Sequence, residues 1–155
     1  MIKRFFVEVA EAFSSSGAAE PSAVDREAAI RKATAVLMLD VARADYVFEE
    51  SEFERVLELV ERHFGLSAEE TVQLVNDAGD EAEDLTSVHQ FTELLHEHLD
   101  DTDKARIVAL LWQIAYADGR LDKYEDSLVL KISDLLYVSR ARVMRLKHDA
   151  ELAAR

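Results

Sequence analysis

The chain has no cysteine, one proline and four glycines among its 155 residues. Without cysteine it can form neither disulfides nor thiolate metal sites. So few helix-breaking residues favour long helices. The longest apolar run, residues 107–117, is much shorter than the roughly 20 residues that cross a bilayer. These absences predict one compact, soluble, cytoplasmic protein without a membrane span.

Acidic residues outnumber basic residues by 32 to 18, which gives a formal net charge of −14. Nucleic-acid binding depends mainly on lysine and arginine side chains that neutralise phosphates, so this balance argues against nucleic acid as a partner. It also disfavours adhesion to anionic lipid. It is compatible with cations, with protein partners of unknown identity, or with nothing beyond solubility.

Apolar residues recur at helical spacing along nearly the whole chain, and no alternating run supports a sheet. Ser51 and Ser67 each begin a Ser-x-x-Glu pattern that fits a capping box at a helix start. Residues 36–44 and 107–117 are apolar on almost all sides, so two helices should lie in the core. The fold expected is an all-α, compact bundle of seven or eight helices. The helices predicted are residues 2–13, 22–44, 51–64, 67–78, 87–99, 103–117, 122–137 and 139–155.

Residues 14–21, which are rich in serine and alanine, divide the chain into two predicted parts. Residues 1–21 would form an N-terminal amphipathic helix and flexible linker, and residues 22–155 the helical domain. The first helix carries Phe5, Phe6, Val9 and Phe13 at near-helical spacing. We expect it to dock onto the body or onto a partner, a second copy of the chain included. Residues 77–84 are acidic and contain a glycine, which predicts an irregular connection.

One acidic pattern occurs twice, in residues 42–52 and 115–125. Each copy has the sequence Ala-x-Ala-Asp, six further residues and a glutamate. The intervals from Asp45 to Asp118 and from Glu52 to Glu125 both equal 73 residues. A repeat of this length is typical of a helical hairpin that buries its apolar face against its twin. Packing needs only the apolar periodicity, so the repeated carboxylates suggest a paired site.

Each of these carboxylates also has a structural interpretation. Asp122 and Glu125 fit a capping box, in which they would bond only to backbone. Asp45 and Asp118 follow predicted helix ends, where a carboxylate meets the negative end of the helix dipole at a cost of about 0.3–1 kcal/mol. No local partner is evident for either aspartate. A bound cation, or the N–H groups at the start of a neighbouring helix, should offset this cost.

Residues 114–125 read Ile114-Ala115-Tyr116-Ala117-Asp118-Gly119-Arg120-Leu121-Asp122-Lys123-Tyr124-Glu125. This segment resembles the signature of the TerB-like family, the tellurite-resistance TerB domain and its relatives. The resemblance covers about residues 28–152. It implies an all-helical domain with a duplicated helical hairpin, divalent-cation binding by acidic residues of both copies, and a stress-response or envelope-associated role.

The resemblance assigns the cation ligands to Asp118 and Glu125, and less directly to Asp45 and Glu52, because the first copy has tyrosine where the second has Gly119. Secondary candidates are Glu49 and Asp122. Calcium or magnesium would suit such a site, since hard cations prefer carboxylate oxygens. The spacing is not that of an EF-hand, because an arginine stands where that loop needs an oxygen ligand.

Two further groups have simpler interpretations. One helical stripe has the spacing of zinc or nickel ligands, but it lies away from the apolar face, which favours a solvated surface. Its members are His89, Glu93, His96 and Asp100. Asp40 and Arg43, three residues apart, fit an intrahelical ion pair at the edge of the core.

Three functions follow as alternatives. The first is a non-enzymatic, cation-binding helical module. The second is a structural protein-interaction adaptor with no metal, in which the acidic pairs are helix caps. The third is a carboxylate-based hydrolase. The sequence has no Gly-rich phosphate loop, no Gly-x-Ser-x-Gly elbow and no cysteine nucleophile, so we expect no enzymatic activity.

Overall fold

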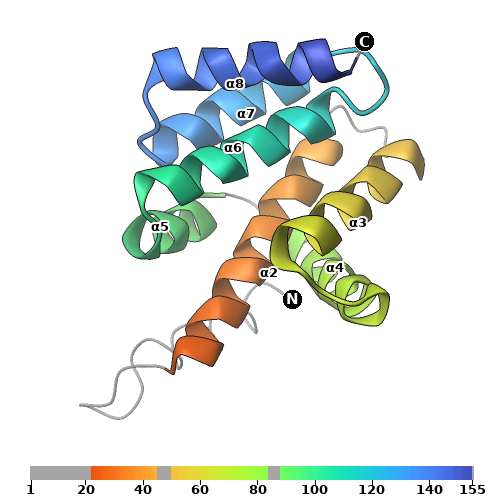
Figure 1. The fold of residues 1–155 in the computed structure, drawn as a ribbon, viewed down its shortest axis with the longest axis vertical. Helices are drawn as coiled ribbons and strands as arrows, with labels where there is room; N and C mark the ends of the chain where they lie inside the picture. The colour runs from red at the N-terminus through yellow and green to blue at the C-terminus, as the bar shows by residue number, and fades with distance from the viewer. Residues whose placement is uncertain (1–21, 45–49, 84–87, 155) are drawn as a thin grey trace.

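The structure, a computed structural model, describes residues 22–44, 50–83 and 88–154, apart from the side chains of Ser51 and Glu83. Over these residues the chain forms seven helices and no strand (Figure 1). They are α2 (Ala23–Ala42), α3 (Glu50–Phe64), α4 (Ala68–Glu83), α5 (His89–His98), α6 (Asp101–Ala115), α7 (Lys123–Leu135) and α8 (Arg140–Ala153). Among these seven, none is long and apolar enough to cross a membrane. The predicted all-α bundle is confirmed, while the predicted helix at 2–13 and its linker lie outside the described residues.

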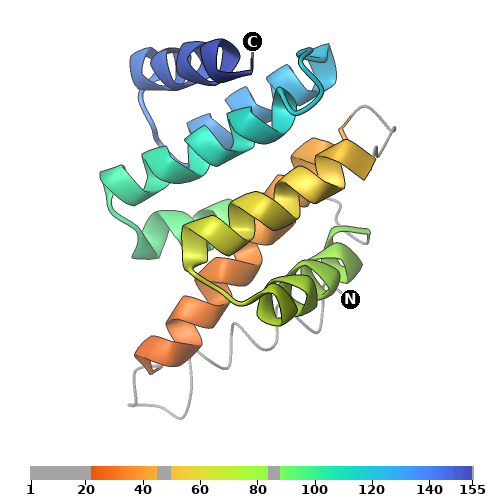
Figure 2. The same cartoon turned by 45° about the vertical axis from the view of Figure 1, so that its right-hand side comes forward.

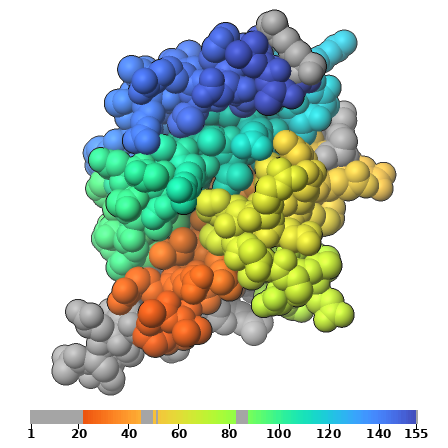
Figure 3. Space-filling model, viewed as in Figure 1, coloured from red at the N-terminus to blue at the C-terminus, as the bar shows by residue number. Residues whose placement is uncertain are grey.

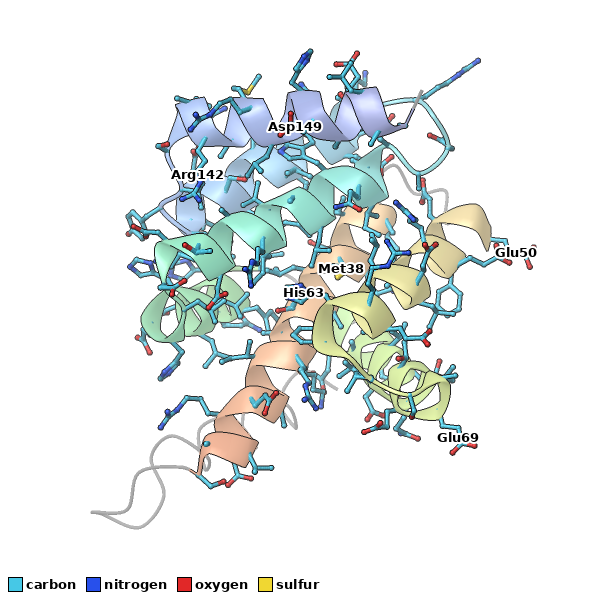
Figure 4. The ribbon with its side chains drawn as sticks, viewed as in Figure 1. Met38, Glu50, His63, Glu69, Arg142 and Asp149 are labelled. Atoms are coloured by element: carbon cyan, nitrogen blue, oxygen red, sulfur yellow. The ribbon has the colours of Figure 1, made fainter. Side chains whose placement is uncertain are left out.

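Helix α2 is the central element of the bundle. It contacts α3, α4, α5, α6 and α7. Every side chain from Ala33 to Leu39 is buried, and Met38 lies among the surrounding helices in Figure 4. The buried Thr34 hydroxyl donates a hydrogen bond to the Ile30 carbonyl at 2.8 Å, so this polar group is satisfied within its own helix. The predicted helix that is apolar all round is therefore a core helix.

Helix α6 is the second core helix. It contacts α2, α3, α7 and α8, and Trp112 in its last turns has no exposed surface. Figures 1 and 2 show α6, α7 and α8 stacked at one end of the molecule, with α3 and α4 beside α2. The two helices that precede Asp45 and Asp118 thus pack against each other, as the sequence predicts.

Helix α4 is longer than predicted, and the irregular connection expected at residues 77–84 is wrong as far as Glu83. Val75, Ala78 and Ala82 are buried at helical spacing in the helix that packs on α2. Gly79 lies inside this helix, where a Cβ would be 3.9 Å from Leu39 Cδ1. Packing against α2 therefore outweighs the helix-breaking tendency of glycine.

The helix starts test the predicted caps. Ser67 and Glu70 form a reciprocal capping box, with both N–H···O distances at 3.1 Å. The box predicted at Ser51 is wrong, because α3 begins at Glu50 and places Ser51 inside the helix. Helix α6 begins two residues earlier than predicted because Asp100 is its N-cap. The Asp100 Oδ1 atom accepts a hydrogen bond from the Asp103 N–H at 2.8 Å.

The helix ends keep the interval found in the sequence. Helices α2 and α6 end at Ala42 and Ala115, and α3 and α7 begin at Glu50 and Lys123, so both pairs are 73 residues apart. The residue after α2 and the residue after α6 each donate an N–H to the carbonyl four residues earlier, at 3.0 Å in both copies. These matches agree with a duplicated hairpin. The duplication itself stays a prediction, to be checked by superposing residues 34–64 on 107–137.

Candidate functional site

Along the chain, the predicted ligands fall at the starts of α3 and α7 and in the residues that precede these two helices. Asp45 and Glu49 lie outside the described residues. The four that the structure describes are Glu52 in α3, Asp118 in the turn after α6, Asp122 directly before α7, and Glu125 in α7.

Glu52 and Glu125 occupy equivalent places. Each is the third residue of its helix, and each is only 2% exposed. The first turn of a helix carries unpaired N–H groups and the positive end of the helix dipole, which stabilise a carboxylate. Burial has the opposite effect, because it removes the charge from water. The sequence predicts the helix starts but not this burial.

Glu70 gives a comparison within the same chain. It is also the third residue of its helix, α4, but it is exposed. Hydrogen bonds from the Ser67 backbone N–H and from the Ser67 hydroxyl hold the pKa of the Glu70 carboxyl below its ordinary value. A glutamate at this position can therefore cap a helix in full contact with water. Capping does not require the burial found at Glu52 and Glu125.

Asp118 lies in the turn that follows α6, three residues past the helix end, and its side chain is exposed. Its Oδ1 accepts a hydrogen bond from the Arg120 N–H at 3.0 Å. The expectation that Asp118 has no local partner is therefore wrong. Gly119 has a φ of +84°, and nothing lies within 4 Å of where its Cβ would be. The left-handed backbone, not space, favours glycine there.

Asp122 is the N-cap of α7. Its Oδ2 accepts hydrogen bonds from the Tyr124 N–H at 2.8 Å and from the Glu125 N–H at 3.2 Å. This is the Asp122 half of the predicted capping box. Its carboxylate already has a structural role, which weakens it as a primary metal ligand.

The described carboxylates do not by themselves complete a metal centre. Within residues 22–44, 50–83 and 88–154, no three histidine, aspartate or glutamate side chains group closely enough to hold a metal ion. The donors are all carboxylates, which suits calcium or magnesium. A site of the predicted kind must therefore include Asp45 or Glu49, which lie outside these ranges.

Comparison with protein families places the chain. The family model described as Tellurite resistance protein TerB matches residues 31–148. The chain belongs to the TerB family. The match includes both acidic copies and all six candidate ligands, and it confirms the resemblance seen at residues 114–125. Comparisons with curated proteins and with solved structures find no match.

In this TerB-family chain, the helical stripe formed by His89, Glu93, His96 and Asp100 is a solvated surface, as its place away from the apolar face predicts. All four of its members are exposed. The His89 Nε2 atom lies 3.7 Å from a Glu93 carboxylate oxygen, and the His96 Nδ1 atom lies 2.5 Å from Nζ of the buried Lys104. Both histidines therefore have side-chain neighbours of their own, and the stripe is not part of the candidate site.

Asp40 lies at the edge of the core, as its spacing to Arg43 predicts. Burial raises the pKa of the Asp40 carboxyl above its ordinary value, while Arg43 and Lys131 act in the opposite direction. Lys131 comes from α7, so sequence spacing gave no sign of it. These three side chains and Tyr124 help to line a cavity of about 570 Å³ between α2 and α7.

Glu81 is a buried carboxylate that the sequence did not identify. It is 2% exposed, like Glu52 and Glu125, and it lies in the part of α4 predicted to be irregular. Its neighbours Ala78 and Ala82 continue the apolar spacing of α4. Following that spacing past Gly79 would have placed Glu81 in a helix.

Proposed function

We propose that this TerB-family protein is a non-enzymatic helical module that binds a divalent cation, calcium or magnesium, through acidic residues of both copies. It would act in a stress-response or envelope-associated assembly, as the family resemblance implies. The observation that carries the proposal is the matched burial of Glu52 and Glu125 at the third residue of their helices. Capping alone does not account for that burial, because Glu70 caps α4 while exposed.

The proposal depends on Asp45. The three other proposed ligands, Glu52, Asp118 and Glu125, form no group of three within the described ranges. Asp45 stands in the first copy where Asp118 stands in the second, so it is the natural further donor. The most direct test therefore includes Asp45→Asn.

The alternative is a protein-interaction adaptor without metal. It is favoured by the hydrogen bonds that Asp118 and Asp122 already make to backbone N–H groups of their own turn. In this alternative the acidic residues shape the segment between α6 and α7, and the helical surface itself is what partners contact. The two functions differ in their response to cations.

Thermal melting in the presence of calcium or magnesium separates the two functions. A ligand that binds only the folded state stabilises it by RT ln(1 + [L]/Kd), about 2.7 kcal/mol at 100 times Kd. For a chain of 155 residues, each 1 kcal/mol corresponds to roughly 2–4 °C in Tm. We expect a rise of roughly 5–11 °C in the wild type under those conditions. We expect little or no rise in Asp45→Asn or Glu125→Gln.

Glu70→Gln is the matched control, because it removes a carboxylate from the same helical position at an exposed site. It should lower Tm slightly, because glutamine keeps the capping hydrogen bond but loses the favourable charge at the helix start, and it should keep the full response to cations. An equal response in Glu125→Gln and Glu70→Gln would indicate nonspecific binding to an acidic surface. An unchanged Tm with calcium, magnesium, manganese and zinc would contradict cation binding and favour the adaptor.

A further inference from the structure

A groove between α2 and α4 lies apart from the candidate metal site. Its volume is about 430 Å³, and Ala28, Leu66 and Leu74 supply its apolar surface. Both leucines are only partly buried and pack against the edge of the core. Figure 3 shows the surfaces of α2 and α4 side by side at the end of the molecule opposite α8.

The rim of this groove is acidic. Glu69, Glu70 and Asp77 line it and are exposed, and Figure 4 shows the Glu69 side chain extending outward from α4. Among the described residues, Arg31 is the one basic residue of the lining, and its guanidinium is paired with Glu27 at 2.8 Å. An apolar floor with acidic edges suits an amphipathic helix that combines large apolar side chains with basic ones. The lining therefore defines the chemistry that an occupant of the groove would have to match.

We propose that the occupant is the N-terminal segment of the same chain, residues 2–13. This segment, which lies outside the described residues, has Phe5, Phe6 and Phe13 at near-helical spacing, and Lys3 and Arg4 beside the first of them. The aromatic side chains match the apolar floor, and Lys3 and Arg4 at the start of the segment match the acidic rim. Glu8 and Glu11 follow later in the segment, so the charge match is confined to its first residues. The proposal is independent of cation binding.

Lengths support an intramolecular contact. As a helix, the 12 residues 2–13 would extend about 18 Å, which is enough to cover the groove residues of α4 from Glu69 to Asp77, about 12 Å along the helix. The eight residues 14–21 can span up to roughly 26–29 Å. Ala28, on the groove wall, lies only six residues beyond Ser22, about 9 Å along α2. The segment can therefore reach the groove of its own chain at a high effective concentration.

Disulfide trapping tests the contact cleanly, because the chain has no cysteine of its own. We would introduce Val9→Cys with Gln73→Cys in the full chain and follow disulfide formation at low protein concentration. Val9 is near the middle of the segment and Gln73 near the middle of the groove, so the pair does not depend on the direction of docking. The control pair is Val9→Cys with Met144→Cys, since Met144 is 43% exposed on the distant α8.

We expect an intramolecular disulfide in the groove pair that forms roughly tenfold or more faster than in the control pair. Adding Phe5→Ser and Phe6→Ser to the groove pair should reduce its rate to that of the control. Equal rates in the two pairs, or a disulfide between two chains, would overturn the proposal. An undiminished rate in the serine variant would also overturn it, because proximity through the linker would then explain the trapping.

Discussion

Replacing Gly79 by alanine is expected to stabilise the protein. In a helix interior alanine is favoured over glycine by about 0.8–1.0 kcal/mol. Gly79 lies inside α4 with an ordinary helical backbone, and the added methyl group would meet only Leu39 Cδ1, at the ordinary contact distance of 3.9 Å. The whole gain should therefore be realised, and Tm should rise by roughly 2–4 °C.

Gly65→Ala is the matched control with the opposite expected sign. Gly65 follows α3 with a φ of +65°, and nothing lies within 4 Å of its would-be Cβ. Space is thus no obstacle, but a left-handed backbone costs an L-residue roughly 1–2 kcal/mol. Part of this cost is offset because alanine restricts the unfolded chain more than glycine does. The net result should be a loss of about 1 kcal/mol and a Tm lower by roughly 2–4 °C.

Calorimetry or circular-dichroism melts of the two variants beside the wild type would test this reasoning. Opposite shifts would support the helix described at residues 77–83. A decrease in Gly79→Ala as large as that in Gly65→Ala would refute it. That outcome would restore the irregular connection expected from the sequence.

Two further predictions concern charged side chains near the core. Burial raises the pKa of the Asp40 carboxyl in the folded state above its ordinary 3.8. Between 3.8 and the raised pKa of the folded state, the folded chain binds more protons than the unfolded chain, so the free energy of unfolding falls as pH rises through this window. Asp40→Asn should therefore be more stable than the wild type at neutral pH and equal to it below about pH 3; parallel pH profiles in urea unfolding would contradict this. Lys147→Met keeps the apolar stem but loses the 2.7 Å ion pair with Asp126 and the ammonium 5.2 Å from the Trp112 ring centroid. It should cost about 1 kcal/mol in low salt and less in high salt, and equal stability in low salt would count against both contacts.

Local sequence was sufficient to predict most of the helices and the N-cap of α7. A helix closes its hydrogen bonds between residues four apart, so apolar spacing and caps carry the necessary information. Asp122 was recognised as a cap for this reason. The largest difference was at the end of α4, where packing against α2 extends the helix through Gly79.

What only the tertiary structure decided is which side chains leave water. Glu52, Glu70 and Glu125 share one position in their helices, yet two are buried and one is exposed. Lys131 lies close enough to act on Asp40 although 91 residues separate them in the chain. Burial and contacts between helices depend on how separate helices pack, and the periodicity of one helix holds no information about its neighbours.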